Sequence, residues 1–175
     1  MTSPRIQPDP ALALLGLYDD ALPQVYGYLL SRCGDRALAE ELTSETFLGA
    51  VSACRKSGAP EVSVGWLIGI ARHKLADHWR GQQRRERTLR AVHDPHGEHD
   101  DPWDVELDKL VARDVLAELA THHRAALTLR YLDGLSVSEV AQLLERTVHA
   151  TEALLVRART AFRKQYQLHT GEEGR

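Results

Sequence analysis

The stretch from Tyr131 to Phe162 constrains the fold most, because it holds two helix-start signals around a short break. Ser136 and Glu139 stand three residues apart before an apolar run. This is the spacing of a capping box, in which the hydroxyl and the carboxylate each accept a backbone N–H bond. The apolar residues that follow recur at helical spacing: Val137, Val140, Ala141 and Leu144. The pattern predicts a short helix that begins at Ser136.

A second helix is predicted after the break at residues 145–147, where Thr147 can cap it. Its expected inner face consists of Val148, Thr151, Leu155, Ala158 and Phe162. Two short helices joined by a tight turn form a helix-turn-helix, whose second helix fits a DNA major groove. This part of the chain therefore points to DNA.

Length and composition limit what the rest of the chain can be. Its 175 residues, 43% of them apolar, suffice for one or two small domains with cores of their own. No apolar run approaches the roughly 20 residues that span a bilayer, and residues 1–8 lack a signal-peptide segment. We therefore expect a cytoplasmic protein without membrane insertion. Cys33 and Cys54 are expected to be reduced thiols that behave as small apolar residues.

The net charge of −3 conceals three blocks of different sign. Residues 1–90 carry 12 basic and 10 acidic side chains, residues 91–120 carry 2 and 9, and residues 121–175 carry 8 and 6. An acidic middle with a net charge of −7 therefore separates two ends of +2 each. Blocks of one sign are typical of solvated or linking segments rather than of core.

The N-terminal half has the apolar periodicity of three helices. The first two lie between Ala11 and Val51 with a break at residues 34–35, and the third runs from about Ser63 to Arg84 or beyond. Between them, residues 57–60 form a loop. The stripes of the first two are Leu22, Val25, Tyr26, Leu29 and Leu30, then Leu38, Leu42, Phe47 and Val51. The inner face of the third is Trp66, Leu67, Ile70, Ala71, Leu75 and Trp79.

The sequence after the third helix reads as a linker. Residues 90–104 contain two prolines, a glycine and no regular apolar period. Helices resume near Val105, and another is expected at residues 123–131 before the helix-turn-helix. The stripe of the first of these helices is Leu107, Leu110, Val111, Val115, Leu116 and Leu119.

These patterns define the expected fold. With no strand pattern in the sequence, they predict an all-α protein made of two small helical domains, at residues 11–88 and 107–168. Residues 89–106 form a flexible acidic linker between them, and the C-terminal domain contains the helix-turn-helix.

The third helix becomes strongly cationic along its length. Seven basic side chains stand between residues 72 and 90, namely Arg72, Lys74, Arg80, Arg84, Arg85, Arg87 and Arg90, and Asp77 and Glu86 offset two of them. A cationic helix with Trp66 and Trp79 could attract phosphates and offer rings for base stacking. The alternative is a solvated helix face with both tryptophans in the core.

Other chemistry has little support in the sequence. The histidines and carboxylates of residues 93–101 are possible zinc ligands, but Pro95 and Gly97 leave them without a fixed geometry. A solvated acidic linker is the favoured interpretation, and no metal is expected. No phosphate loop or nucleophile elbow is present. We expect neither an enzyme nor a cofactor, because the helix-surface carboxylates lack an evident acid–base partner: Asp19, Asp20, Glu40, Glu41 and Glu45.

Three stretches, in chain order, carry a resemblance to a known family. Residues 39–47 (AEELTSETF) form an acidic segment that ends in a phenylalanine. Residues 66–80 (WLIGIARHKLADHWR) form a helix with a Trp-Leu-x-x-Ile-Ala-Arg pattern. Residues 127–141 (LTLRYLDGLSVSEVA), with VRAR at residues 156–159, form the helix-turn-helix region. In this order they resemble the extracytoplasmic-function sigma factors, the small bacterial subunits that give RNA polymerase its promoter specificity.

The resemblance, which covers about residues 11–90 and 107–166, implies roles for the two domains. The N-terminal domain would bind the polymerase clamp through Glu41, Glu45, Phe47 and Leu48. It would capture the −10 element as single-stranded DNA through Arg55, Lys56, Ser63, Trp66, Arg72, His73, Lys74 and Arg80. The C-terminal domain would read the −35 duplex through Arg130, Ser136, Thr147, His149, Ala150, Glu152, Ala153 and Arg157.

The resemblance also implies partners. They are core RNA polymerase, promoter DNA and an anti-sigma factor that restrains the protein. The acidic linker would thread toward the active-site and RNA-exit channel, where its charge mimics nucleic acid.

Several positions depart from the family pattern. Ser44 replaces the usual glutamine, His73 replaces the usual asparagine, and no aromatic residue stands where the family often has one near Ser63. In the predicted recognition helix, Glu152 and Leu154 stand where basic residues are usual. Two interpretations stay open. The helix reads an unusual −35 sequence through His149, Ala150, Glu152 and Ala153, or it reads duplex DNA weakly.

Two other functions are alternatives to a sigma factor. A helix-turn-helix DNA-binding regulator would use only residues 107–166, and would need neither the acidic segment at residues 39–47 nor the cationic helix. A degenerate sigma-like protein would bind polymerase or another protein without starting transcription. The altered recognition helix is the feature that favours this second alternative.

Overall fold

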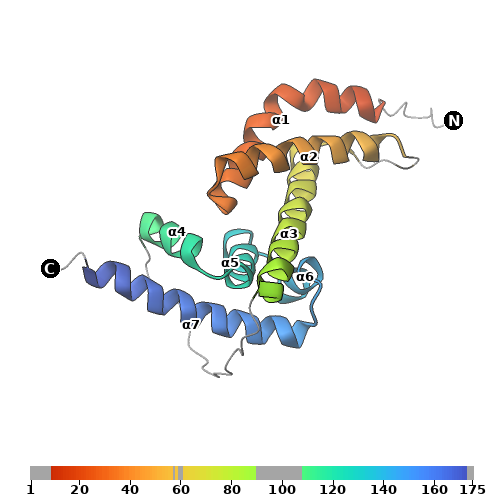
Figure 1. Ribbon diagram of the computed structural model, residues 1–175. Coiled ribbons are helices and arrows are strands. Elements are labelled where there is room, and N and C mark those ends of the chain that lie inside the picture. Colours follow the sequence, from red (N-terminus) through yellow and green to blue (C-terminus); the bar gives the residue numbers. More distant parts are fainter. Residues whose placement is uncertain (1–8, 57, 59–60, 90–107, 173–175) are drawn as a thin grey trace. The chain divides into compact units, whose positions relative to one another are not determined.

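The computed structural model describes residues 9–56, 58, 61–89 and 108–172, and every regular element in this part of the chain is a helix (Figure 1). The all-α prediction is therefore confirmed. Most of the predicted linker, and with it the histidine-rich segment at residues 93–101, lies outside the described residues. No helix in the described part is long and apolar enough to cross a membrane.

The chain divides into two compact units, Met1–Leu75 and Ala76–Arg175. Helix α3 (Val64–Leu89) runs through this boundary, so its first half belongs to one unit and its second half to the other. The predicted domain ends near residues 88 and 107 stay predictions.

In the first unit, α1 (Pro10–Cys33) and α2 (Arg36–Cys54) are joined by a two-residue break. Gly34 ends α1 with φ +69°, in the left-handed region where a glycine has no Cβ penalty. Asp35 then begins α2, since its carboxylate accepts the N–H of Leu38 at 3.0 Å. The predicted break at residues 34–35 is confirmed and has a local cause.

The core of the first unit lies between α1, α2 and the first half of α3. The rings of Tyr18 and Phe47 meet edge-to-face with their centroids 4.9 Å apart. Thr43 and Thr46 are buried, but their hydroxyls donate to the carbonyls of Ala39 and Leu42 at 2.6 and 2.7 Å, so neither hydroxyl lacks a hydrogen bond. The buried apolar side chains are Leu14, Ala21, Val25, Leu29, Cys33, Ala39, Leu42, Phe47, Ala50, Cys54, Leu67, Ala71 and Leu75.

In the second unit, α7 (Val148–Glu172) packs against α4 (Lys109–Glu118), α5 (Thr121–Leu127) and α6 (Val137–Leu143). Between α5 and α6 the chain makes a short π-helical turn, η1 (Thr128–Leu132). The buried apolar residues of these elements are Val115, Ala125, Ala126, Leu127, Leu129, Val140, Ala141, Leu143, Leu154, Leu155, Ala158 and Phe162.

The structure corrects the predicted inner faces in this unit. Val148 was predicted to be buried but is 45% exposed in the first turn of α7. Leu110 is 73% exposed in the first turn of α4. Leu154, which the family pattern places among DNA-facing positions, is fully buried. The helix predicted at residues 123–131 is α5 followed by the π-helical turn.

Candidate nucleic-acid and protein interfaces

The capping box that begins α6 is present. The Ser136 hydroxyl accepts the N–H of Glu139 at 3.3 Å, and the Glu139 carboxylate accepts the N–H of Ser136 at 2.7 Å. A tight turn follows, in which Glu145 takes φ +52° and the N–H of Arg146 donates to the carbonyl of Ala141 at 2.9 Å. The predicted helix-turn-helix is therefore confirmed as α6, this turn and α7.

The start of α7 separates a buried face from an exposed one. Thr147 caps the helix, since its hydroxyl accepts the N–H of Ala150 at 3.1 Å. The buried face carries Thr151, Leu154 and Leu155, and Ala150 is half-buried. The exposed face carries Val148, His149, Glu152 and Ala153. Glu152 is the only charged side chain between Val148 and Leu155, so this exposed face bears a negative charge.

Basic side chains flank that face. Arg146 precedes α7 and Arg157 lies two turns along it, and both are half-buried. Burial lowers the pKa of the Arg146 guanidinium, and the nearby positive charges of Arg87 and Arg157 lower it further. Several guanidinium groups are thus held near one another, an arrangement that an anion such as a phosphate would stabilise.

Arg130, another predicted −35 residue, supports the fold directly. Its guanidinium donates to the carbonyl of Leu135 at 2.7 Å and so ties the π-helical turn to the residue before the cap of α6. Arg159 of α7 donates to the hydroxyl of Tyr131 at 3.1 Å. The first bond ties η1 to the start of α6, and the second ties η1 to α7. The sequence gives no sign of the Arg130 bond.

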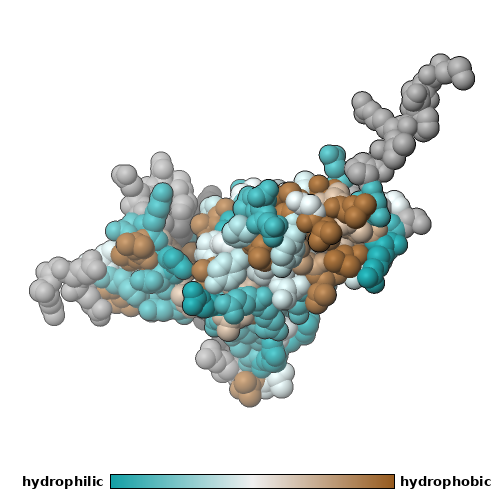
Figure 2. Space-filling view, turned by 90° about the horizontal axis from the view of Figure 1, so that it is seen from above, coloured by the Kyte–Doolittle hydropathy of each residue, from teal (hydrophilic) through white to brown (hydrophobic). Residues whose placement is uncertain are grey.

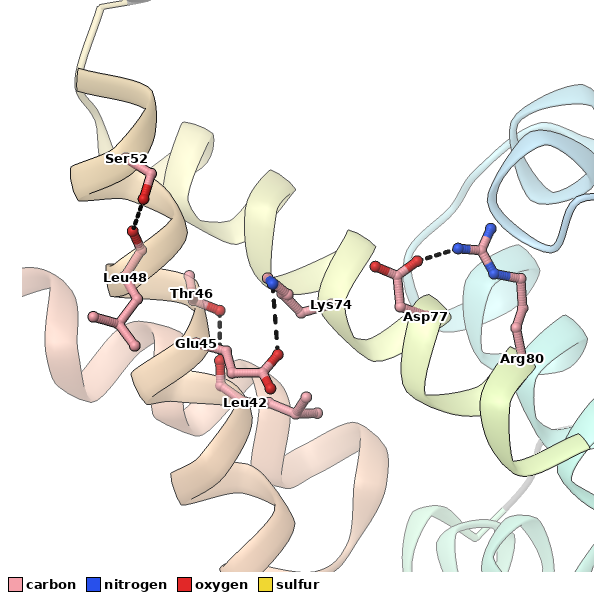
Figure 3. Close-up of polar contacts among 8 residues, drawn as sticks. All are labelled: Leu42, Glu45, Thr46, Leu48, Ser52, Lys74, Asp77 and Arg80. Atoms are coloured by element: carbon pink, nitrogen blue, oxygen red, sulfur yellow. Dashed lines mark hydrogen bonds and ion pairs between the residues drawn. The ribbon is translucent and has the colours of Figure 1, made fainter. Parts of the chain in front are cut away.

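The first half of α3 presents consecutive basic residues. Ser63 begins the helix by accepting the N–H of Trp66 at 3.2 Å, and Trp66 is half-buried. His73 is exposed, and Lys74 is half-buried and lies 3.6 Å from the Glu45 carboxylate (Figure 3). Arg55 and Lys56 are exposed where α2 ends, across the loop from Ser63. Most of the predicted −10 residues thus lie at the start of α3 or beside the loop that precedes it.

Arg80 stands apart because it belongs to the second unit. Its guanidinium bonds to Asp77 on the same helix (Figure 3), donates to the carbonyl of Leu143 at 3.0 Å and lies 2.8 Å from the Glu145 carboxylate. This predicted DNA-binding side chain is therefore already bonded to the turn of the helix-turn-helix.

The predicted protein-binding residues of α2 separate into two groups. Glu41 and Leu48 are exposed, and Glu45 is half-buried beside Lys74. Phe47 is only 9% exposed because its ring packs against Tyr18. Phe47 is thus a core residue that positions its neighbours, whereas Glu41, Glu45 and Leu48 are available to a partner.

A hollow between α1 and α2 lies on the same unit and was missed by sequence reasoning. Its volume is about 380 Å³, and its lining consists of Leu22, Pro23, Tyr26, Glu40, Thr43 and Ser44. Leu22 and Tyr26 were assigned to the core stripe of α1, but both are half-buried. Glu40 and Ser44 of α2 line the same hollow. These two polar residues are the signal in the sequence that could have indicated an uncovered part of the α1 stripe.

Family models match both units of the chain. The model described as Sigma-70 region 2 matches residues 17–85, and the model described as Sigma-70, region 4 matches residues 109–162. The ECF RNA polymerase sigma factor SigC of Mycobacterium tuberculosis is 36% identical over 128 residues, which are 73% of this chain and 69% of SigC. The chain belongs to the ECF sigma factors.

Other relatives agree with this assignment. SigL of Mycobacterium tuberculosis is 30% identical over 85% of this chain and 87% of its own length. BldN of Streptomyces coelicolor is 35% identical over 88% of this sigma factor, which spans only 60% of BldN. Among solved structures, the sigma factor RpoE from Bartonella quintana, in complex with the anti-sigma factor NepR, has a TM-score of 0.51 and 19% identity. It covers 89% of this chain and 95% of its own, and it supports the fold alone.

Proposed function

We propose that this sigma factor binds core RNA polymerase, directs it to promoters and takes part in DNA melting at initiation. The observation that carries the proposal is that one chain contains both sigma regions in order, the first with an acidic helix face and the second with a helix-turn-helix. As an initiation factor it would act in the cytoplasm with no catalytic chemistry of its own, under the control of an anti-sigma partner.

The polymerase-binding face is assigned to α2 and the hollow beside it. Glu40 lines the hollow and Glu41 is exposed next to it, while Glu45 follows Glu41 after one turn of the helix. Acidic groups around an apolar depression repel DNA phosphates and favour a protein surface with basic residues around an apolar side chain. The polymerase clamp is the partner that this surface would take.

The −10 strand is assigned to the start of α3. Arg72, His73 and Lys74 are consecutive, so a helix spreads them over much of its circumference, and the half-buried Trp66 lies two turns earlier. Single-stranded DNA is bound by cationic grooves with aromatic rings, since every base can stack. We expect Arg72 and Lys74 to contact phosphates of the melted strand.

The −35 duplex is assigned to the exposed face of α7. Of the two interpretations left open by the sequence, an acidic exposed face with Glu152 favours the second, in which the helix reads duplex DNA weakly. A glutamate accepts a hydrogen bond from cytosine but repels phosphates at every site. This sigma factor would then depend on its first unit and on polymerase for most of its promoter affinity.

Co-elution with bacterial core RNA polymerase on gel filtration tests the proposal. Wild-type protein is expected to co-elute and to support run-off transcription, whereas Glu41→Lys is expected to weaken binding roughly tenfold because it reverses a charge on the docking face. Asp114→Lys, the same change on the exposed side of α4, is the matched control and should bind as wild type does.

Two results would contradict the proposal. A folded wild-type protein that fails to bind polymerase but binds duplex DNA would indicate a stand-alone regulator. A protein that binds polymerase through Glu41 without starting transcription at any selected promoter would indicate a degenerate sigma-like protein.

A further inference from the structure

Three arginines of the second unit lie near one another although they come from separate elements. Arg87 is in the last turn of α3, Arg146 is in the turn of the helix-turn-helix, and Arg157 is in α7. The positive charges of Arg87 and Arg157 both act on the Arg146 guanidinium. We call these three residues the arginine cluster.

Gln83 joins two members of the cluster. With its amide turned so that the oxygen faces the guanidinium groups, Gln83 accepts a hydrogen bond from Arg87 at 3.0 Å and one from Arg146 at 2.7 Å. Gln83 and Arg87 are four residues apart, so they lie on the same face of α3. A neutral oxygen therefore stands between two positive charges, where the oxygen of an anion would bind more strongly.

The turn fixes the place of Arg146. Glu145, the residue before it, has φ +52°, in the left-handed region, and the N–H of Arg146 donates to the carbonyl of Ala141 at 2.9 Å. The Arg146 side chain is half-buried. With its backbone bonded and its side chain partly removed from solvent, Arg146 has little freedom to move away from its positively charged neighbours.

The surroundings of Arg146 disfavour its positive charge. Burial and the two neighbouring guanidinium groups lower the pKa of this arginine. The carboxylates that adjoin the cluster in the sequence are bonded to residues outside it. Glu86 accepts a hydrogen bond from the Thr121 hydroxyl at 2.7 Å, and the Glu145 carboxylate lies 2.8 Å from the Arg80 guanidinium. An anion bound at the cluster would supply the charge that Arg146 lacks.

The convergence of the three arginines indicates what kind of anion fits. Figure 2 shows hydrophilic side chains over much of the surface, so one exposed cation does not single out a site on this protein. Guanidinium groups bind phosphate oxygens through paired hydrogen bonds. Each phosphate of a DNA strand carries a single charge, and these charges are spread along the strand. A terminal phosphate carries a charge of nearly −2 on one compact group, which matches converging arginines better.

We propose that the arginine cluster, together with Gln83, is a binding site for a small anion that carries a terminal phosphate or a pyrophosphate group. Such a ligand would bond to α3, to the turn and to α7 at once, and would stabilise this part of the second unit. The site uses residues of the second unit alone and requires neither polymerase nor promoter DNA, so it does not depend on the proposed function.

Isothermal titration calorimetry of the full chain with inorganic pyrophosphate, in metal-free buffer at constant ionic strength, tests the inference. Wild type is expected to show saturable binding at one site. Arg87→Gln should weaken it roughly tenfold, because charge-assisted hydrogen bonds are lost. Arg85→Gln is the matched control and should change the affinity by less than about twofold. Arg85 is exposed and stands two residues from both Gln83 and Arg87, which places it on another side of α3.

A second variant and thermal melting check that the loss is not a folding defect. Arg146→Gln should weaken pyrophosphate binding as Arg87→Gln does. If Arg146→Gln melts early because its side chain is half-buried, the exposed Arg87 still provides the test. Pyrophosphate should raise the melting temperature of wild type and of Arg85→Gln, and should have little effect on that of Arg87→Gln.

A short DNA duplex without terminal phosphates separates the two sources of phosphate. The inference predicts that Arg87→Gln lowers the affinity for pyrophosphate and changes the affinity for the duplex by less than about twofold. An equal loss for both ligands would make the cluster a contact for the DNA backbone and would overturn the inference. Wild type that shows no saturable binding, or Arg85→Gln that loses as much affinity as Arg87→Gln, would overturn it as well. In each of these cases the proposed function is unaffected, since its test is binding to polymerase.

Discussion

The Phe47 side chain packs against Tyr18, and its ring is almost fully removed from solvent. In the family pattern the same residue marks the polymerase-binding segment. Both statements hold if Phe47 fixes the position of α2 and its neighbours Glu45 and Leu48 make the contact. A substitution at Phe47 would then act through the fold, which makes it a poor test of binding.

We therefore predict that Phe47→Ala lowers the free energy of unfolding of the first unit by about 3–4 kcal/mol, since it removes a buried ring and leaves a cavity. Leu48→Ala, at the exposed neighbouring position, should change it by less than about 0.5 kcal/mol. Urea titration followed by circular dichroism measures both. Equal destabilisation by the two variants would contradict the buried position of Phe47.

The capping box of α6 is expected to stabilise the second unit. Ser136→Ala removes the acceptor for the Glu139 N–H and should cost about 1 kcal/mol in the free energy of unfolding of the second unit. Ser138→Ala, at an exposed serine in the first turn of the same helix, is the control and should have little effect. Because alanine has a higher helix propensity than serine, a control as destabilising as Ser136→Ala would mean that loss of the cap does not account for the effect.

At the scale of elements, helix starts could be predicted because their causes are local. The break at Gly34 and the caps at Ser136 and Thr147 depend on bonds between residues a few positions apart, and the sequence contains all the partners. The positions of exposed leucines could not be predicted in this way. Leu110 and Val148 fit the apolar period of their helices, yet in the described part of the chain their side chains are 73% and 45% exposed.

In the candidate sites, too, local motifs could be predicted from the sequence and features that depend on packing could not. The helix-turn-helix and the acidic segment of α2 were visible in the sequence as motifs. The hollow beside Leu22 and Tyr26 was not, since it results from the way in which two helices pack. In the sequence, Leu154 stands where the family usually has a basic residue, which suggested a missing contact with DNA. In the structure Leu154 is buried, on the same side of α7 as the buried Thr151, Leu155 and Ala158.

The exposed face of α7 leads to a prediction about DNA. Glu152→Lys should raise the affinity for duplex DNA of any sequence severalfold and make the salt slope steeper by about one unit, because it replaces a repelled charge with an attracted one. Asp114→Lys, with the same change in charge on α4, should do less. Measurement of binding at several salt concentrations on two unrelated duplexes checks this. A Glu152→Lys protein that loses affinity for one cytosine-containing site would instead assign base reading to Glu152.

At the scale of the whole molecule, charge is divided between surfaces. The acidic face of α2 suits a protein partner, the basic start of α3 suits phosphates, and an acidic middle segment lies between the two sigma regions in the sequence. If the proposed function holds, such a division would let one small chain bind polymerase and DNA at once without the two partners competing for a surface.

Arg80 is the exception to this division, because this basic side chain is bonded to two carboxylates. Its guanidinium is shared between Asp77, the Leu143 carbonyl and Glu145, so a phosphate that binds Arg80 competes with the Glu145 carboxylate. Glu145→Gln should therefore raise the affinity of the free protein for single-stranded −10 DNA, and Arg80→Ala should lower it. Because Glu145 is largely exposed, the pair is worth at most about 1 kcal/mol, which limits the change to roughly fivefold.

A double-mutant cycle isolates this effect. If Glu145 acts only by competing for Arg80, Glu145→Gln should have no effect on strand affinity in the Arg80→Ala background, as anisotropy with a labelled oligonucleotide would measure. An equal gain in strand affinity in both backgrounds would mean that Glu145 repels the strand directly. Arg80 would then bind DNA without breaking its ion pair with Glu145. The first result would mean that Arg80 has to break its ion pair with Glu145 before it binds the promoter strand. Polymerase would favour strand binding if it separated Arg80 from the helix-turn-helix.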